Sequence, residues 1–334
     1  MTGRLCISLY YTGDSEGGLN MNFPPRIKPR RLYPGDTLGI IAPASPGNAA
    51  AAQAGINWLK SQGYRIKTGA SVHQTLGFLA GSDELRAADI HRMFASPEID
   101  GIICLRGGYG TMRLLELLDY DLIRANPKVF VGYSDITALH LSIGQRTGLI
   151  TFHGPMAASD MSRGLSEHTG SAFFRAVAGN RPIGRITNPP AAPPPAFITP
   201  GRAEGRLTGG NLSLLSATLG TPYEIDTRRK IICMEEVGEA PYRIDRMLTQ
   251  LLLAGKLQTA AGLVFAVCAD CDGDEDEPDF TVDQVLQERL GGLNIPVLYH
   301  LYFGHTDEKV TLPLGAKAIL DRRGLAVKET VTIA

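Results

Sequence analysis

The sequence predicts an α/β protein of two domains, and three observations lead to this fold class. From Gly35 onward, short apolar runs alternate with segments of helical spacing, which is the pattern of β-α units around a parallel sheet. A proline-rich stretch at residues 181–202 interrupts the alternation, which then resumes. The length of 334 residues suits about two domains of ordinary size.

In the first part of the chain, apolar runs predict buried strands, and helically spaced segments predict the helices between them. Strands are expected at residues 37–43, from residue 64, at 101–105 and at 129–131. Helices are expected at residues 49–62, 83–94 and 112–118, and from about residue 136. This order predicts parallel strands joined by helical crossovers.

The stretch at residues 181–202 is rich in proline and alanine and has no helical period, so it predicts an extended linker. We therefore expect a tail at residues 1–32, an α/β domain at 33–180, the linker at 181–202 and a β/α domain at 203–334. Glycines and prolines break regular structure in the tail, although translation could also start at Met21. In the last domain, the expected strands are 230–235, 263–267, 310–312 and 317–320. Three helices are expected there: one that follows residue 211 and ends at 219, one at 244–254 and one at 282–290.

Charge and hydropathy exclude several classes of partner. The formal net charge is −1, without the basic excess typical of proteins that bind nucleic acids or anionic membranes. No apolar stretch approaches the ~20 residues of a membrane-spanning helix. The apolar run at residues 5–11 is too short for a signal peptide and lacks a cleavage site. We expect a cytoplasmic protein with no membrane and no nucleic acid partner.

The cysteines predict neither a disulfide framework nor a metal site. There are five of them, an odd and scattered set. Cys268 and Cys271 form a C-x-x-C pair, but a structural zinc site usually needs four ligands and no second pair exists. The acidic stretch at residues 270–279 has its glycine at the wrong position for an EF-hand, so it predicts a solvated loop. No metal is expected.

One serine lies between an apolar strand and the start of a helix, in the run Val129-Phe130-Val131-Gly132-Tyr133-Ser134-Asp135-Ile136-Thr137. A sharp strand-to-helix turn exposes such a hydroxyl, and the first amides of the helix can stabilise an oxyanion. The run departs from G-x-S-x-G because Thr137 replaces the last glycine. The alternative is that Ser134 or Asp135 only caps the helix, and the local pattern alone favours that alternative.

A second candidate follows the strand at 101–105, in Arg106-Gly107-Gly108-Tyr109-Gly110. Glycines there let a backbone approach a ligand and present free N–H groups. The spacing is not G-x-G-x-x-G and no Walker lysine follows, so a nucleotide loop is not indicated. The segment is either a plain turn or a wall of an oxyanion pocket beside Ser134.

A serine nucleophile needs a base and a carboxylate that orients the base. His140 lies along the expected helix after Ser134 and should point away from the turn, whereas His153 and His305 lie near strand ends. Glu235 and Glu236 end the strand at 230–235, where a carboxylate can reach a crevice. Strand alternation sends only one of the two glutamates there.

Several motifs occur in an order that resembles the LD-carboxypeptidase family of serine peptidases, which includes the microcin C self-immunity hydrolases. They are Gly107-Gly108-Tyr109-Gly110, Gly132-Tyr133-Ser134-Asp135, His153-Gly154-Pro155, Gly209-Gly210-Asn211, Glu235-Glu236-Val237-Gly238-Glu239, Pro241-Tyr242-Arg243-Ile244-Asp245-Arg246-Met247-Leu248 and Gly304-His305. The resemblance runs from about residue 35 to about residue 321.

The resemblance implies a catalytic triad of Ser134, Glu235 and His305, with Glu235 preferred to Glu236. It implies a flavodoxin-like N-terminal parallel-sheet domain and a smaller C-terminal β/α domain, with the active site at their interface. It further implies a homodimer that needs no cofactor and removes D-Ala from muropeptide tetrapeptides. The amide of Asp135 and the Gly107–Gly108 turn would then receive the oxyanion, and Arg106 suits recognition of the substrate's terminal carboxylate.

Three rival functions stay open at this point. A hydrolase of microcin-type peptide-nucleotides would want an aromatic platform for the base, and Trp58, the only tryptophan, lies in an expected helix. An amidotransferase-like hydrolase would use Cys104 at a strand end. A muropeptide-binding module with a degenerate site would need no complete set of Ser, Glu and His.

Overall fold

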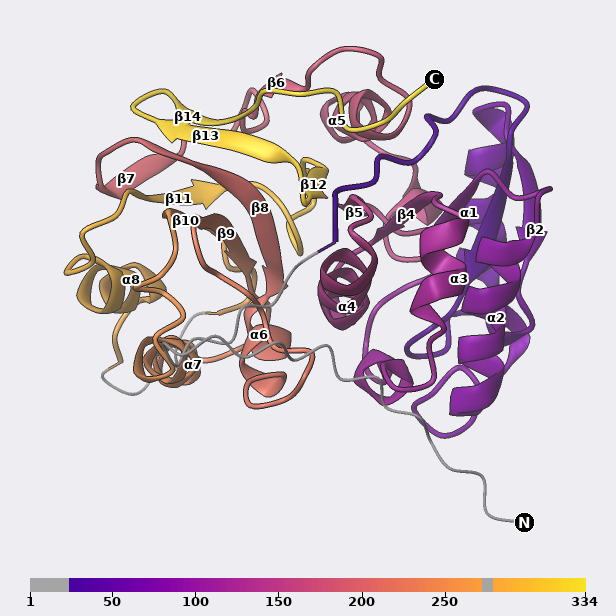
Figure 1. Ribbon diagram of the computed structural model, residues 1–334, viewed down its shortest axis with the longest axis horizontal. Helices are drawn as coiled ribbons and strands as arrows, with labels where there is room; N and C mark the ends of the chain where they lie inside the picture. The colour runs from indigo at the N-terminus through magenta and orange to yellow at the C-terminus, as the bar shows by residue number, and fades with distance from the viewer. Residues whose placement is uncertain (1–23, 272–278) are drawn as a thin grey trace.

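The computed structural model describes residues 24–271 and 279–334, and they form two α/β domains around two sheets (Figure 1). Most of the expected tail, residues 1–23, lies outside the described residues, as do residues 272–278 of the acidic stretch. The rest of the expected tail is not loose. Ile27 forms a bridge to Leu149 and Arg30 to Ile333, and Leu32 is buried in the core, because its apolar side chain has a partner surface there.

The first sheet has the strand order β12-β5-β4-β3-β1-β2. Its parallel part has the flavodoxin-like order β2-β1-β3-β4-β5, which confirms the expected fold class. The strands are β1 (Thr37–Ile41), β2 (Arg65–Thr68), β3 (Gly101–Cys104), β4 (Val129–Gly132), β5 (Thr151–His153) and β12 (Leu312–Leu314). The last of these comes from the far end of the chain and pairs antiparallel with β5.

Helices cover both faces of this sheet, which is why its central strands read as continuous apolar runs. The helices are α1 (Ala49–Ser61), α2 (Asp83–Ala95), α3 (Tyr120–Ala125), α4 (Thr137–Thr147) and α5 (Glu167–Val177). Alternate side chains of one strand point to opposite faces. Leu38 and Ile40 therefore pack in the core that contains α1 and α5, and Ile41 packs in the one that contains α2 and α4.

The helix expected at residues 112–118 is shorter than the sequence predicts. The structure has a 3-10 turn at Thr111–Leu114, and a separate helix, α3, starts at Tyr120. Asp119 accounts for the break, because its side chain accepts the Leu122 amide at 2.9 Å and starts the new helix. Three further 3-10 turns lie at Ala70–His73, Ser134–Ile136 and Met161–Arg163.

The second sheet has eight strands in the order β6-β14-β13-β8-β9-β10-β11-β7. They are β6 (Gly184–Arg185), β7 (Ala196–Thr199), β8 (Ala203–Asn211), β9 (Lys230–Glu235), β10 (Gly262–Ala266), β11 (Val297–Leu301), β13 (Lys317–Asp321) and β14 (Gly324–Val327). Its helices are α6 (Leu212–Ala217), α7 (Pro241–Leu253) and α8 (Val282–Leu290). Strands β8 to β11 are parallel, so β9 and β11 deliver their carboxyl ends to one edge.

The segment at residues 181–202 is more than an extended linker. It contains β6 and β7, which pair antiparallel with β14 and β11. Between them, Asn188 donates from Nδ2 to the His300 carbonyl at 2.8 Å and accepts the Tyr302 amide at 3.0 Å. The proline-rich chain is therefore fastened to the second sheet beside the segment that follows β11.

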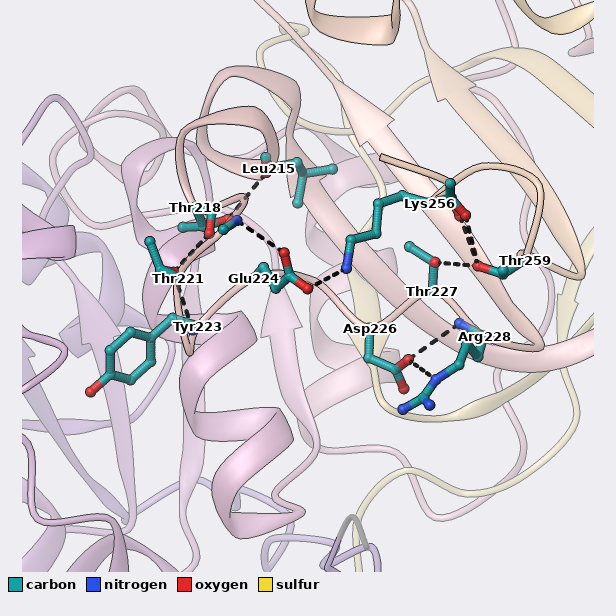
Figure 2. Close-up of polar contacts among 12 residues, drawn as sticks. Leu215, Thr218, Thr221, Tyr223, Glu224, Asp226, Thr227, Arg228, Lys256 and Thr259 are labelled. Atoms are coloured by element: carbon teal, nitrogen blue, oxygen red, sulfur yellow. Dashed lines mark hydrogen bonds and ion pairs between the residues drawn. The ribbon is translucent and has the colours of Figure 1, made fainter. Parts of the chain in front are cut away.

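Polar contacts fix the start of β9 (Figure 2). Lys256 donates to Glu224 at 2.6 Å, and the hydroxyls of Thr227 and Thr259 lie 2.8 Å apart. These contacts tie the chain before β9 to the turn before β10. Strand β9 is thus anchored at the end opposite to Glu235.

Candidate active site

Ser134 begins the turn between β4 and α4. Its φ is 65°, in the left-handed region that residues other than glycine rarely adopt. Backbone strain of this kind at a strand-to-helix turn keeps a side chain exposed at the carboxyl end of a parallel sheet. The Ser134 side chain is indeed partly exposed, while its neighbours Tyr133 and Asp135 are buried.

The loop after β3 lies directly against this turn. A Cβ on Gly107 would stand 2.8 Å from Oγ of Ser134 and 3.4 Å from the backbone nitrogen of Asp135. Only glycine leaves that space open, so the Ser134 hydroxyl and the Asp135 amide border one small region. Gly108 has φ 116°, and the Tyr109 amide donates to Oγ of Ser45 at 3.1 Å, which joins this loop to the one after β1.

Two buried side chains hold the loop in place. The Asp135 carboxylate accepts the Thr111 amide at 2.8 Å, and burial raises the pKa of this carboxyl although Thr111 and Gly110 donate to it. Arg86 is fully buried and donates from Nη1 to the Gly110 carbonyl at 3.0 Å. Neither side chain needs to contact a ligand to fix the position of Gly107.

Arg106 extends outward from the same loop. Its Nη1 lies 3.5 Å from the Pro46 carbonyl, and the side chain is exposed. No ion pair engages it within the described residues. Its guanidinium is therefore free to meet an anionic group at the rim.

Glu235 and His305 form a hydrogen-bonded pair. Glu235 is the last residue of β9 and is fully buried, and His305 lies in the segment after β11. Nδ1 of His305 donates to Oε2 of Glu235 at 2.7 Å. Gly304 allows this approach, because its φ is +79° and a Cβ there would meet the Glu235 carboxylate.

The two pKa values move apart, as expected for an imidazole-carboxylate pair. Burial alone would raise the pKa of Glu235, but His153 and His305 outweigh it and hold the pKa at about 2. Burial would lower the pKa of His305, and the Glu235 carboxylate raises it instead. Glu235 therefore stays ionised, and its carboxylate favours the protonated form of the His305 imidazole.

Glu236 points to the other side of β9. Its carboxylate accepts the Ser213 amide and hydroxyl at 2.8 Å each and Nδ2 of Asn211 at 2.9 Å. It therefore satisfies the Ser213 amide in the first turn of α6, and burial raises the pKa of Glu236. Because side chains alternate along a strand, Glu235 faces His305 and Glu236 faces the start of α6.

Tyr133 connects the turn at Ser134 with His305. Their rings meet edge to face, with centroids 5.0 Å apart. No hydrogen bond joins Ser134 to His305 within the part of the chain that the structure describes. Lys309 lies over the Tyr133 ring at 4.7 Å and pairs with buried Asp160, whose Oδ1 also accepts the Tyr133 hydroxyl at 3.2 Å.

Sequence reasoning missed this group of Tyr133, Asp160 and Lys309. It also placed His140 wrongly, because His140 does not point away from the turn. Nε2 of His140 donates to the Gly132 carbonyl at 2.8 Å, two residues before Ser134. A helix that starts directly after a sharp turn folds back over the strand, and this brings a buried side chain of its first turn to the strand end.

Cys104, the thiol that a cysteine-dependent hydrolase would use, is not available as a nucleophile. Cys104 is fully buried, and burial raises the pKa of its thiol well above the ordinary value. Cys268 and Cys271 are free thiols. Within residues 24–271 and 279–334, no three potential ligands gather in a way that could hold a metal ion.

An open hollow of about 490 Å³ adjoins His305. Its wall includes Pro189 and Ala192 of the proline-rich segment, together with Tyr302. A hollow of this size suits a small ligand. Among the described residues, no helix combines the length and the hydropathy needed to span a lipid bilayer.

Two family models match this chain. The LD-carboxypeptidase N-terminal domain matches residues 38–154, and the LD-carboxypeptidase C-terminal domain matches residues 204–320. The candidate residues of both sheets fall inside these ranges.

Relatives and solved structures agree with the match. A probable murein peptide carboxypeptidase of Bacillus subtilis is 40% identical, over 90% of this chain and 93% of its own. The murein tetrapeptide carboxypeptidase of Pseudomonas aeruginosa is 31% identical, over 85% and 92%. A muramoyltetrapeptide carboxypeptidase from Oxalobacter formigenes superimposes with a TM-score of 0.76 at 32% identity, over 88% and 99%.

The microcin C7 self-immunity protein also resembles this chain. A structure of it in complex with glutamyl sulfamoyl guanosine has a TM-score of 0.84 at 26% identity, and it covers 92% of this chain and 99% of its own. The family models, the relatives and the fold thus agree, and the chain belongs to the LD-carboxypeptidase family of serine peptidases.

Proposed function

We propose that this protein is a serine carboxypeptidase that releases the terminal D-Ala of muropeptide tetrapeptides by cleaving an L-D peptide bond, with Ser134, His305 and Glu235 as its triad. One observation carries the proposal. His305 is hydrogen-bonded to the ionised Glu235 at 2.7 Å and packs on the residue that precedes the strained Ser134. An oriented base beside an exposed serine is the arrangement that nucleophilic catalysis needs.

In the proposed reaction, Nε2 of His305 removes the hydroxyl proton as Oγ of Ser134 attacks the scissile carbonyl. Nδ1 keeps its proton, which stays hydrogen-bonded to the Glu235 carboxylate. This carboxylate orients the imidazole and stabilises the imidazolium. The imidazolium then gives its proton to the leaving amino group of D-Ala, and an acyl-enzyme remains. Water, activated by the same histidine, releases the shortened peptide.

The negative charge on the carbonyl oxygen needs donors close to Ser134. The Asp135 amide borders the space in front of Gly107, as an oxyanion donor must. The backbone of Gly107 and Gly108 would supply the opposite wall. The buried contacts of Asp135 and Arg86 hold these groups before the substrate arrives, so little reorganisation is needed during the reaction.

The substrate class follows from the relatives named as murein peptide carboxypeptidases. Arg106 is exposed beside the glycine loop, and a guanidinium suits the carboxylate at the end of such a peptide. This role for Arg106 gives a reason for cleavage at the terminal residue. Removal of D-Ala from recycled wall peptides takes place inside the cell, so we infer a cytoplasmic protein. The family resemblance is the ground on which we also infer a homodimer that works without a cofactor.

A microcin-type peptide-nucleotide is the second candidate substrate, favoured by the resemblance to the microcin C7 self-immunity protein. A nucleotide base wants an exposed aromatic platform. Trp58, the only tryptophan, stacks on Phe174 between α1 and α5, with ring centroids 6.2 Å apart, so one face of its ring is already covered. This packing favours the muropeptide.

Mass spectrometry of a disaccharide-tetrapeptide incubated with the protein tests the proposal. The expected result is loss of one alanine, with free D-Ala as the second product. Peptides that end in L-Ala or in D-Ala-amide should release far less. Equal release from all three would indicate a general amidase, and cleavage of the peptide-nucleotide alone would favour the second candidate.

A further inference from the structure

Glu235 has one carboxylate oxygen that the pair with His305 does not use. Oε2 accepts from His305, whereas Oε1 is buried and has no hydrogen-bond partner among the described residues. A buried carboxylate oxygen without a donor is costly, so such an atom in a native site calls for a partner. Nε2 of His153 stands 3.9 Å from it, just beyond hydrogen-bond length.

His153 likewise lacks hydrogen-bond partners. Its side chain is 1% exposed, and neither ring nitrogen has a hydrogen-bond partner within the described chain. Rings surround it: the centroids of Phe303, Tyr133 and His140 lie 5.7, 5.9 and 6.3 Å away. These rings fix the plane of the imidazole, and the unpaired oxygen of Glu235 lies on its Nε2 side.

The place of His153 in the fold adds a reason for the contact. His153 ends β5 and stands in register with Gly132 of β4, two residues before Ser134. Glu235 and His305 belong to the second domain. A bond from His153 to Glu235 would therefore tie the acid and base to the domain that carries the nucleophile.

We propose that His153 is a positioning residue that donates from Nε2 to Oε1 of Glu235 and so holds the other oxygen on His305. The inference rests on the proposed serine mechanism and adds a fourth residue to it. A ring shift of less than 1 Å would bring the 3.9 Å separation of the two atoms into the ordinary hydrogen-bond range of about 3 Å.

Other titratable groups surround the pair and must be held constant in any test. They are Tyr133, His140, Glu236, Cys268 and Lys309. His140 is the neighbour most like His153. Burial lowers its pKa to about 3, so it is neutral and contributes no titration near neutral pH.

The test compares His153→Phe with His153→Gln and His140→Phe in the full chain, assayed on the disaccharide-tetrapeptide over a range of pH. Phenylalanine keeps the ring and removes the donor, and glutamine restores an N–H near the position of Nε2. His140→Phe is the matched control, because it makes the same change in a neighbouring ring. In this variant the Gly132 carbonyl loses the contact with His140 but still accepts the Gly154 amide, which lies 3.1 Å from it.

His153→Phe should lower kcat by about ten- to a hundredfold, as loss of a supporting contact to a catalytic group typically does, with little change in KM. It should also move the acidic limb of kcat/KM to higher pH. Without the second donor, charge concentrates on Oε2, which favours the protonated form of both Glu235 and His305. His153→Gln should recover most of the kcat, and His140→Phe should leave the limb in place.

Equal losses in His153→Phe and His140→Phe with an unmoved limb would overturn the inference, because a packing role alone predicts that result. Glu235→Gln, measured in parallel, isolates the proposed function: near-wild-type turnover there would refute the triad instead. An NMR titration of His305 in Ser134→Ala protein, with and without His153→Phe, checks the direction without any turnover. A pKa of His305 that stays the same or falls would contradict the proposal.

Discussion

The ring of Tyr133 meets the ring of His305 edge to face, with centroids 5.0 Å apart, although the two residues belong to different domains. Tyr133 precedes Ser134 in the chain, and Lys309 covers the tyrosine ring at 4.7 Å. An aromatic side chain of the domain that holds Ser134 therefore contacts the imidazole that the second domain contributes. This contact sets where the imidazole can lie relative to the serine.

Ser134→Ala should lower kcat by about a thousandfold or more, because removing a nucleophile abolishes the covalent path. The fold should persist, since alanine requires no new space. Release of D-Ala and the thermal unfolding curve are the two measurements. Ser142→Ala is the matched control, because this buried hydroxyl lies further along α4, where it donates to the Leu139 carbonyl at 3.2 Å, and its loss should leave kcat nearly unchanged.

Glu235→Gln should lower kcat by about a hundredfold or more, because a neutral amide cannot stabilise the imidazolium. Glu236→Gln should leave kcat almost unaltered. It should instead destabilise the protein by about 1 kcal/mol, since Glu236 accepts the Ser213 amide at the start of α6. Steady-state kinetics and thermal unfolding separate the two effects. The reverse ranking would place the acid one residue later.

The acidic limb of kcat/KM should lie above pH ~6.5, the value of an ordinary histidine. His305 must be neutral to act as the base, and the Glu235 carboxylate raises its pKa against the effect of burial. Activity is therefore full above the raised pKa and falls as pH drops through it. The pKa of Glu235 is about 2, so its protonation adds nothing in this range. In the residual activity of Glu235→Gln, the acidic limb should move to lower pH, because burial and Lys309 lower the pKa of His305 and the main group that raises it has been removed.

Gly107→Ala should nearly abolish turnover without unfolding the protein. The new Cβ would lie 2.7 Å from Cβ of Ser134 and 2.8 Å from its Oγ, which forces the nucleophile out of place. Gly292→Ala is the control, because nothing lies within 4 Å of a Cβ at that position. Steady-state kinetics on both variants is the measurement. A wild-type kcat in Gly107→Ala would contradict the geometry described for this loop.

Lys309→Met should destabilise the protein by about 3 kcal/mol or more, because it leaves Asp160 buried without its cation. It should also lower kcat, since the Tyr133 ring loses the lysine that holds it against His305. The double variant Asp160→Asn/Lys309→Met should regain much of the stability. Unfolding by urea measures this recovery, and a double variant no more stable than Lys309→Met would show that the ion pair is not the cause.

The sequence predicts those features that depend on local pattern. The strand at residues 230–235 coincides with β9 because its apolar run is uninterrupted. The alternation of side chains along a strand is enough to predict that Glu235 and Glu236 point to opposite faces. Ser134 can be singled out because a strand and a helix flank it. Its role as nucleophile, and the roles of Glu235 and His305, came from the family resemblance and remain proposals for this chain.

Other features depend on contacts between distant residues. Lys309 reads as a solvated lysine until the fold buries it against Asp160, 149 residues away. His140 was misplaced because helical spacing gives the direction of a side chain along the helix but not the tilt of the helix against β4. The segment at residues 181–202 looks like a linker because proline suppresses helices without preventing the pairing of edge strands.

Strand β12 has a consequence for how the molecule is made. It pairs with β5, and Leu312 lies opposite His153 across a gap of more than 150 positions in the chain. During synthesis, the first sheet emerges with one edge bare and must wait for almost the whole second domain before that edge is closed. A strand that leaves the ribosome late, with only β13 and β14 after it, thus completes the first domain. We expect a fragment that ends before residue 312 to expose β5 and aggregate, and the nucleophile to become competent only when the chain is nearly finished.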